Sequence, residues 1–94
     1  MTTENNKGVV GLEEKHLISI MLFLSMNREC RKIEIYENVS SNPRIPQKLD
    51  RLEAMGLLTQ TYDPNIRSTV IALTPKGRQV SAALVELDKL VKTD

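Results

Sequence analysis

Residues 58–73 constrain the fold of this chain more than any other stretch. Leu58 to Tyr62 alternates weakly between apolar and polar residues, and Ser68 to Leu73 is rich in β-branched residues, which favour strands. The turn signal Asp63-Pro64-Asn65 separates the two stretches. We therefore predict a β-hairpin over residues 58–73, with a loop longer than the two-residue minimum.

Helix signals flank this hairpin on both sides. Gly56 is placed to end a helix as a C′ glycine with positive φ. Pro46 is tolerated only in the first turn of a helix, so the helix before the hairpin is expected over residues 43–55. The pair Thr74-Pro75 is typical of an N-cap followed by the first helical residue, which predicts a helix over residues 75–91.

The first helix is expected over residues 12–27. From Leu17 to Met26 the chain is apolar apart from two serines, which indicates a helix buried on nearly every side. Glu13 and Glu14 are expected in its first turn, where acidic side chains are favourable. A single chain of 94 residues has little material to surround such a helix. This argues for a partner chain.

The remaining segments are short. Residues 1–8 are polar and are expected to form a flexible tail, with residues 9–94 as one domain. Residues 27–31 are interpreted as a polar break. Ile33 and Tyr36, with Val39 three residues further on, predict a second helix over residues 32–39.

Three helices, a hairpin and a last helix predict a mainly α fold with a β-hairpin wing, a winged helix-turn-helix. The sequence resembles small winged-helix transcription regulators of the MarR and PadR kind, in which "L-x-x-L-x-x-x-G-L-L" ends the recognition helix and "L-T-P-K-G-R" opens the next helix. The match covers about residues 33–90 and is densest at Leu49–Leu58 and Leu73–Arg78. The resemblance implies dimerisation through terminal helices, and this layout is typical of archaeal single-domain regulators.

Composition excludes several other classes of protein. One Cys excludes a disulfide framework and, with a single His, limits metal chemistry. No apolar stretch approaches the length of a membrane span, so a cytoplasmic protein without membrane contact is expected. No phosphate loop, nucleophile motif or His–carboxylate spacing is found. We therefore expect no enzyme activity and no cofactor.

The helix predicted over residues 43–55 carries a basic stripe. At about 100° per residue, three cations and one amide side chain lie on the same face of this helix: Arg44, Gln47, Lys48 and Arg51. Asp50 and Glu53 lie away from this face and are interpreted as solvated. Such side chains hydrogen-bond phosphates and base edges in a major groove, which predicts double-stranded DNA as a partner. From Arg44 to Arg78 the net charge is +3, from six cations and three anions, against +1 for the whole chain.

Further DNA contacts are expected around this helix. Arg67 lies at the predicted hairpin tip, where it could enter a minor groove or instead pair with Asp63. Lys32, at the start of the second helix, could bind phosphate or remain solvated. Ser41 and Asn42 could contact phosphate or cap the recognition helix, and capping is the preferred interpretation.

A homodimer is the expected assembly. Seven residues of the first and last helices are the candidate dimer contacts: Leu17, Met21, Leu24, Val80, Leu84, Leu87 and Val91. The last four form a stripe within about 60° on the last helix. This stripe could alternatively pack on its own domain. A dimer would also let two weakly basic faces act together on DNA.

Two single residues are candidates for special chemistry, Cys30 for redox sensing and His16 for metal binding. Cys30 lies beside cations that would lower the pKa of an exposed thiol, but a lone Cys is more often an inert small apolar residue. His16 has no second His nearby and is interpreted as a helix-surface residue.

The chain leaves no room for a separate effector domain, so any small-molecule effector would have to bind between the DNA-binding elements and the dimer helices.

The sequence therefore predicts a homodimeric, sequence-specific DNA-binding protein acting in transcription regulation. The alternative is a winged helix used for protein contact, as a small subunit or adaptor. Its support is the near-neutral net charge and a wing with one basic residue.

Overall fold

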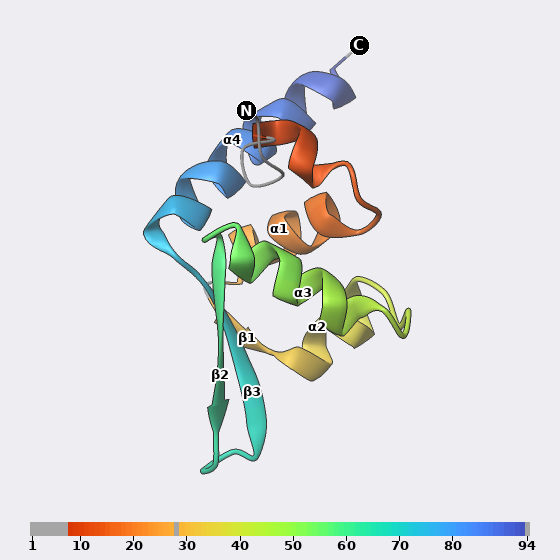
Figure 1. Ribbon diagram of the computed structural model, residues 1–94. Coiled ribbons are helices and arrows are strands. Elements are labelled where there is room, and N and C mark those ends of the chain that lie inside the picture. Colours follow the sequence, from red (N-terminus) through yellow and green to blue (C-terminus); the bar gives the residue numbers. More distant parts are fainter. Residues whose placement is uncertain (1–7, 28, 94) are drawn as a thin grey trace, which may run out of the picture.

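A computed structural model describes residues 8–27 and 29–93 of the chain (Figure 1). The elements follow in the order η2 (Gly8–Leu12, a 3₁₀ turn), α1 (Leu17–Met26), β1 (Glu29–Arg31), α2 (Lys32–Asn38), α3 (Ile45–Ala54), β2 (Leu58–Asp63), β3 (Ser68–Leu73) and α4 (Pro75–Lys92). This order confirms the predicted fold class, a mainly α fold with a β-hairpin. Of the predicted tail, residues 1–7 lie outside the described residues, and Gly8 begins η2.

The hairpin belongs to a three-stranded antiparallel sheet with strand order β1-β3-β2. Its register pairs Leu58 with Leu73 at the base and Asp63 with Ser68 near the tip. The sequence analysis missed β1, which lies in the segment interpreted as a polar break. Three residues are too few to show a period of two. The strand forms because β3 offers a second row of backbone donors and acceptors, on which Cys30 pairs with Ile71.

Helix α1 lies at the centre of the core. Four of its side chains are fully buried: Leu17, Ile20, Met21 and Leu24. They are covered by α2, α3 and α4 of the same chain, with α4 making the most extensive contact. The expectation that α1 needs a partner chain, and that Leu17, Met21 and Leu24 form dimer contacts, was therefore wrong. The remaining elements close around one short helix and leave those three side chains no exposed surface.

The start of α1 also differs from the prediction. The helix begins at Leu17 rather than Leu12, because His16 adopts a left-handed conformation with φ of 74°. Glu13 and Glu14 lie before the helix, in a turn that follows η2. His16 precedes the helix and does not lie on its surface, so that interpretation was also wrong. The turn directs Glu14 toward α3, as described below.

The end of α3 is tied to the start of α4. Gly56 has the predicted positive φ, at 80°. The Thr74 hydroxyl donates to the Gly56 carbonyl at 2.6 Å and accepts from the Gly77 N–H at 2.9 Å. A Cβ on Gly77 would overlap the Leu57 carbonyl oxygen. The two motifs that carry the sequence resemblance are thus in direct contact, and the close approach requires glycine.

Helix α4 is buried only over its first half. Gly77, Ser81 and Leu84 are buried, whereas Leu87, Leu90 and Val91 are 52%, 72% and 75% exposed. Figure 1 shows the C-terminal turns of α4 extending past the helical core, at the end of the molecule opposite the hairpin. The predicted dimer stripe is therefore split: Leu84 and the half-buried Val80 pack on their own chain, and Leu87 and Val91 remain open.

Candidate nucleic-acid interface

The turn before α3 sets the direction of the helix. The Asn42 side-chain oxygen accepts from the Arg44 N–H at 2.8 Å, and the Ser40 hydroxyl accepts from the Asn42 N–H at 3.1 Å. Pro46 lies in the first turn of the helix, where it displaces no intrahelical donor. Asn42 therefore stabilises the turn, and Ser41 is exposed beside it. The N-cap residue of α3 is Arg44, so the interpretation that Ser41 or Asn42 caps the helix was wrong.

One face of α3 is anchored in the core. Ile45, Leu49 and Leu52 have no exposed surface. The opposite face is exposed and includes Gln47, and the exposed Arg44 lies just before it as the N-cap residue of the helix. Arg44 makes no ion pair with another described residue. The N-terminal end of the helix thus presents a free guanidinium and an amide, groups that can hydrogen-bond phosphates and base edges.

The basic stripe is partly neutralised by a residue from outside the helix. Glu14 pairs with two of its cations, at 3.6 Å to Lys48 Nζ and 3.2 Å to Arg51 Nε. The Lys48 side chain is only 15% exposed and lies near the buried edge of the helix, whereas Arg51 is half exposed. Periodicity could not show this pair, because the carboxylate comes from a turn more than thirty residues earlier in the chain.

The acidic side of α3 faces the wing. The Gln60 side-chain amide donates to Asp50 Oδ1 and to Glu53 Oε1, each at 2.9 Å. Both carboxylates are exposed to solvent, as interpreted, but they also connect α3 to β2. This link holds the hairpin in position relative to α3.

The hairpin extends away from the helical core, as Figure 1 shows at the bottom of the view. Arg67 lies in the loop between β2 and β3, is exposed, and has a left-handed φ of 52°. Asp63 uses its carboxylate to accept the Asn65 N–H at 2.9 Å, and the described residues include no Arg67–Asp63 ion pair. The Arg67 guanidinium is thus available at the tip of the wing.

Tyr62 is a candidate contact that the sequence analysis missed. Its side chain is 61% exposed. Side chains alternate between the faces of a strand, so Tyr62 lies on the same face of β2 as Gln60, which reaches α3. An exposed aromatic residue in a short polar strand is the signal that could have identified it.

Lys32 and its neighbour Arg31 lie where β1 meets α2. Arg31 is engaged locally: its N–H donates to Glu34 Oε1 at 2.7 Å and its Nε lies 3.8 Å from the same oxygen. Lys32 is the first residue of α2, is half-buried, and forms no ion pair with a described residue. Of these two cations, Lys32 is the one free to approach a phosphate.

The environment of Cys30 is opposite to that of a reactive thiol. The residue is buried in β1, and burial, with a smaller contribution from Glu34, raises the pKa of its thiol to about 11. A reactive Cys needs an exposed, electropositive environment that lowers the pKa. The structure therefore favours the inert apolar role for Cys30. Among the described residues, no three His, Cys, Asp or Glu side chains gather as metal ligands would.

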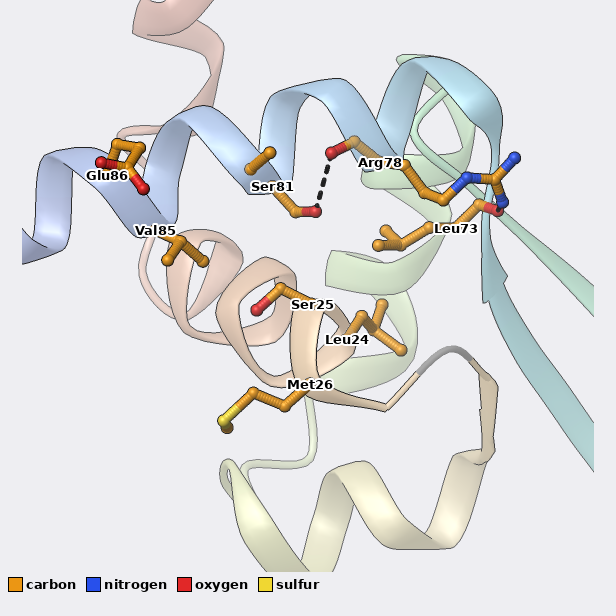
Figure 2. Close-up of a pocket in the computed structure, with 9 residues that line it drawn as sticks. Leu24, Ser25, Met26, Leu73, Arg78, Ser81, Val85 and Glu86 are labelled. Atoms are coloured by element: carbon orange, nitrogen blue, oxygen red, sulfur yellow. Dashed lines mark hydrogen bonds between the residues drawn. The ribbon is translucent and has the colours of Figure 1, made fainter.

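Two cavities flank α4. One, of about 420 Å³, lies between α4 and the C-terminal end of α1 (Figure 2), and Arg78 and Glu86 lie at its two ends. The other, of about 460 Å³, lies between η2 and α4 and is mostly apolar. Val9, Leu12 and Leu87 are among its lining residues, and Lys76 is the only cation among those that the structure describes. Both cavities are lined by residues of α4, the helix beside which an effector was expected to bind.

The fold is a winged helix, as the sequence resemblance implied. Several solved structures share it. A transcriptional regulator homologue from Pyrococcus horikoshii OT3 has a TM-score of 0.76 and 21% identity, over 89% of this chain and 86% of that one. The disulfide form of AbfR has a TM-score of 0.70 and 24% identity, over 90% of this chain and 62% of that one.

The third structure is that of BpsR from Bordetella bronchiseptica, whose DNA binding is regulated by 6-hydroxynicotinic acid. It has a TM-score of 0.65 and 19% identity, over 84% of this chain and 59% of that one. At these identities the likeness concerns the fold. No protein-family model matches the chain, and no curated protein matches its sequence.

Within residues 8–27 and 29–93, no helix is both long enough and apolar enough to cross a bilayer.

Proposed function

We propose that this chain binds double-stranded DNA in a sequence-specific manner and acts in transcription regulation. The observation that carries the proposal is the exposed N-terminal half of α3, where Arg44 and Gln47 project from a helix whose other face is anchored in the core. In helix-turn-helix proteins these N-terminal residues are the ones that contact base edges. The fold shared with transcriptional regulators supports the same conclusion.

The predicted contacts divide into two kinds. Gln47 and Arg44 are proposed to read bases in the major groove. The remaining predicted residues are proposed to hold the phosphate backbone or the minor groove: Lys32, Ser41, Asn42, Lys48, Arg51 and Arg67. Lys48 and Arg51 contribute less than their charge indicates, because Glu14 compensates them.

We further propose that the DNA-binding form is a homodimer. Leu87, Leu90 and Val91 lie three and four residues apart on α4 and form one exposed apolar face. Val9 and Val10 of η2 are also exposed, and Val9 lines the same cavity as Leu87. A second copy is the proposed cover for this surface. Two recognition helices would then contact half-sites about one helical turn of DNA apart.

The competing function is protein contact without strong DNA binding. The Glu14 pairs favour it, because they reduce the positive charge available on α3. Asp50 also lies on the exposed side of the helix. If this function holds, α3 and the wing would form a mixed-charge docking surface, and salt would have little effect on any DNA binding.

One experiment separates the two functions. A preferred DNA site is selected from a random pool, and binding to it and to a scrambled duplex is measured at several salt concentrations. Arg44→Ala is expected to weaken binding to the selected site and to relax the sequence preference, with a loss of about 1–3 kcal/mol in discrimination. Gln47→Ala is expected to change the preferred sequence, with a loss of about 1–3 kcal/mol in discrimination.

The matched control is Lys89→Ala, which removes an exposed cation from the far part of α4. This variant should bind both duplexes as the parent protein does. If Arg44→Ala and Gln47→Ala also bind like the parent protein, α3 is not the DNA surface. If the parent protein shows no salt-dependent binding, the protein-contact function takes precedence.

A small-molecule effector is the remaining proposal. The two cavities beside α4 are the candidate sites, and BpsR, with the same fold, has a DNA binding that a small carboxylic acid regulates.

A further inference from the structure

We propose that Glu14 is a specificity-determining residue, whose carboxylate suppresses non-specific DNA binding by neutralising part of the recognition helix. This inference rests on the proposed DNA binding. It assigns a role to a residue outside the helix-turn-helix and the wing.

The turn before α1 places the Glu14 carboxylate against α3. The Leu17 N–H donates to the Glu14 carbonyl at 3.3 Å, and the Glu13 N–H donates to the Val10 carbonyl at 3.0 Å. Because His16 takes a left-handed conformation, the helix starts only after this turn. Glu14 is therefore held by backbone hydrogen bonds on both sides, and its side chain bridges two cations on neighbouring turns of α3.

The two cations are held differently. Lys48 Nζ lies 3.6 Å from Glu14 Oε1, and its side chain is mostly buried between the turn and the helix. Arg51 Nε lies 3.2 Å from Glu14 Oε2, and its side chain is half exposed. An arginine has five N–H donors in a planar fork, so the contact at Nε leaves the terminal nitrogens of Arg51 free. Glu14 thus keeps Lys48 from contacting a DNA phosphate but leaves Arg51 able to hydrogen-bond one.

The consequence for DNA binding follows from counterion release. Non-specific affinity depends on the number of phosphates that cations neutralise. A lysine that is already paired with a carboxylate neutralises a phosphate only if that pair breaks. Base reading by Gln47 and the N-terminal arginine does not depend on this pair. Glu14 is therefore expected to lower non-specific binding more than specific binding.

The test compares Glu14→Gln with Glu13→Gln. Glu13 is the adjacent residue, is exposed, and forms no ion pair with a described residue. Both variants remove one negative charge from the same turn, so any general effect of net charge is the same. Binding to the selected site and to a scrambled duplex is measured across salt concentrations, and thermal melting confirms that each variant is folded.

Glu14→Gln is expected to bind scrambled DNA severalfold tighter at low salt, with the salt dependence steeper by up to about 1 in log–log slope. The affinity ratio between selected and scrambled DNA should fall. Glu13→Gln should show a clearly smaller change. When Lys48 and Arg51 are both replaced by Ala, adding Glu14→Gln should have no more effect than adding Glu13→Gln. This mutant-cycle comparison of DNA affinities remains valid even if Glu14→Gln lowers the melting temperature.

Three results have distinct meanings. If Glu14→Gln and Glu13→Gln behave alike, the inference is overturned and Glu14 is an ordinary surface charge. Weaker binding of Glu14→Gln to both duplexes also overturns it, because Glu14 would then position Arg51 productively. If the parent protein shows no salt-dependent DNA binding, the proposed function itself fails.

Discussion

At Gly77 the first turn of α4 leaves no room for a side chain. An added Cβ would overlap the Leu57 carbonyl oxygen and lie 2.8 Å from its carbon. At Gly56, in contrast, an added Cβ would make only ordinary van der Waals contact with the Lys76 side chain, at 3.9 Å, and the requirement for glycine comes from its φ of 80°. The two glycines lie close together in the structure but are required for different reasons, one steric and one conformational.

This difference can be measured. Gly77→Ala is expected to lower the free energy of unfolding by about 1–3 kcal/mol, because the backbone of Leu57 has to move. Gly56→Ala should cost about 1–2 kcal/mol from the left-handed conformation, and Gly56→Asn less, since Asn tolerates that region. Urea unfolding of the three variants measures these losses and shows whether Gly56→Asn is less destabilising than Gly56→Ala. An unchanged stability for Gly77→Ala would show that the contact between α4 and Leu57 is looser than described.

Cys30 provides a second prediction at the scale of one residue. Burial raises the pKa of its thiol from 9.0 to about 11. In the unfolded chain the thiol ionises first, so its contribution to stability is fully present below pH 9 and is lost as the pH rises toward 11. The difference in unfolding free energy between the parent protein and Cys30→Ala should therefore shrink over this range. A difference that is constant with pH would contradict the buried thiol.

At the scale of elements, Thr74 joins α3, the hairpin and α4. Its hydroxyl bonds both Gly56 and Gly77, and its N–H donates to the Leu57 carbonyl at 3.1 Å. The N-cap of α4 is thus also the attachment point for the end of the recognition helix. On the other side of α3, Gln60 holds the acidic residues against the wing. The recognition helix is therefore connected to both of the elements that follow it.

Thr74→Val keeps the shape of the side chain and removes both hydroxyl hydrogen bonds. We expect a loss of about 1–2 kcal/mol in unfolding free energy, the usual effect of removing an N-cap. The control is Thr93→Val, whose hydroxyl donates to the Lys89 carbonyl at 2.8 Å at the exposed end of the same helix. Thermal or urea unfolding should show a much smaller effect there. Equal effects of the two variants would contradict the special role of Thr74.

At the scale of the whole molecule, the exposed end of α4 is the proposed dimer surface. Leu87→Glu is expected to raise the dissociation constant of the dimer by about 100-fold or more, because a charge would be buried without a partner. The variant should stay folded, since Leu87 is half exposed within one chain and the buried Leu84 is unchanged.

The matched control introduces the same charge at Gln79→Glu, an exposed position on α4. Sedimentation velocity at micromolar concentration should show a dimer for the parent protein and for the control, and a monomer for Leu87→Glu. A monomeric parent protein under these conditions would contradict the dimer proposal.

Most elements of this fold could be predicted from local signals. Gly56, Pro46 and the Thr74-Pro75 pair mark helix ends through φ preference, a missing donor and a side-chain cap, and these effects act within a few residues. The β-branched run at Ser68–Leu73 marks a strand for the same local reason. The apolar and polar faces of α3 also follow from its period alone, and its apolar face is buried as that period implies.

Other features depend on contacts between distant parts of the chain. Strand β1 exists because β3 lies beside it, and α1 is buried because its own chain folds around it. The Glu14 pairs with Lys48 and Arg51 divide a stripe that looks uniform in sequence. The sequence by itself determined the helices, the two strands of the hairpin and which face of α3 is apolar, because those properties are local. Only the tertiary structure decided which of the exposed charges stay free, because that depends on which segments the fold brings together.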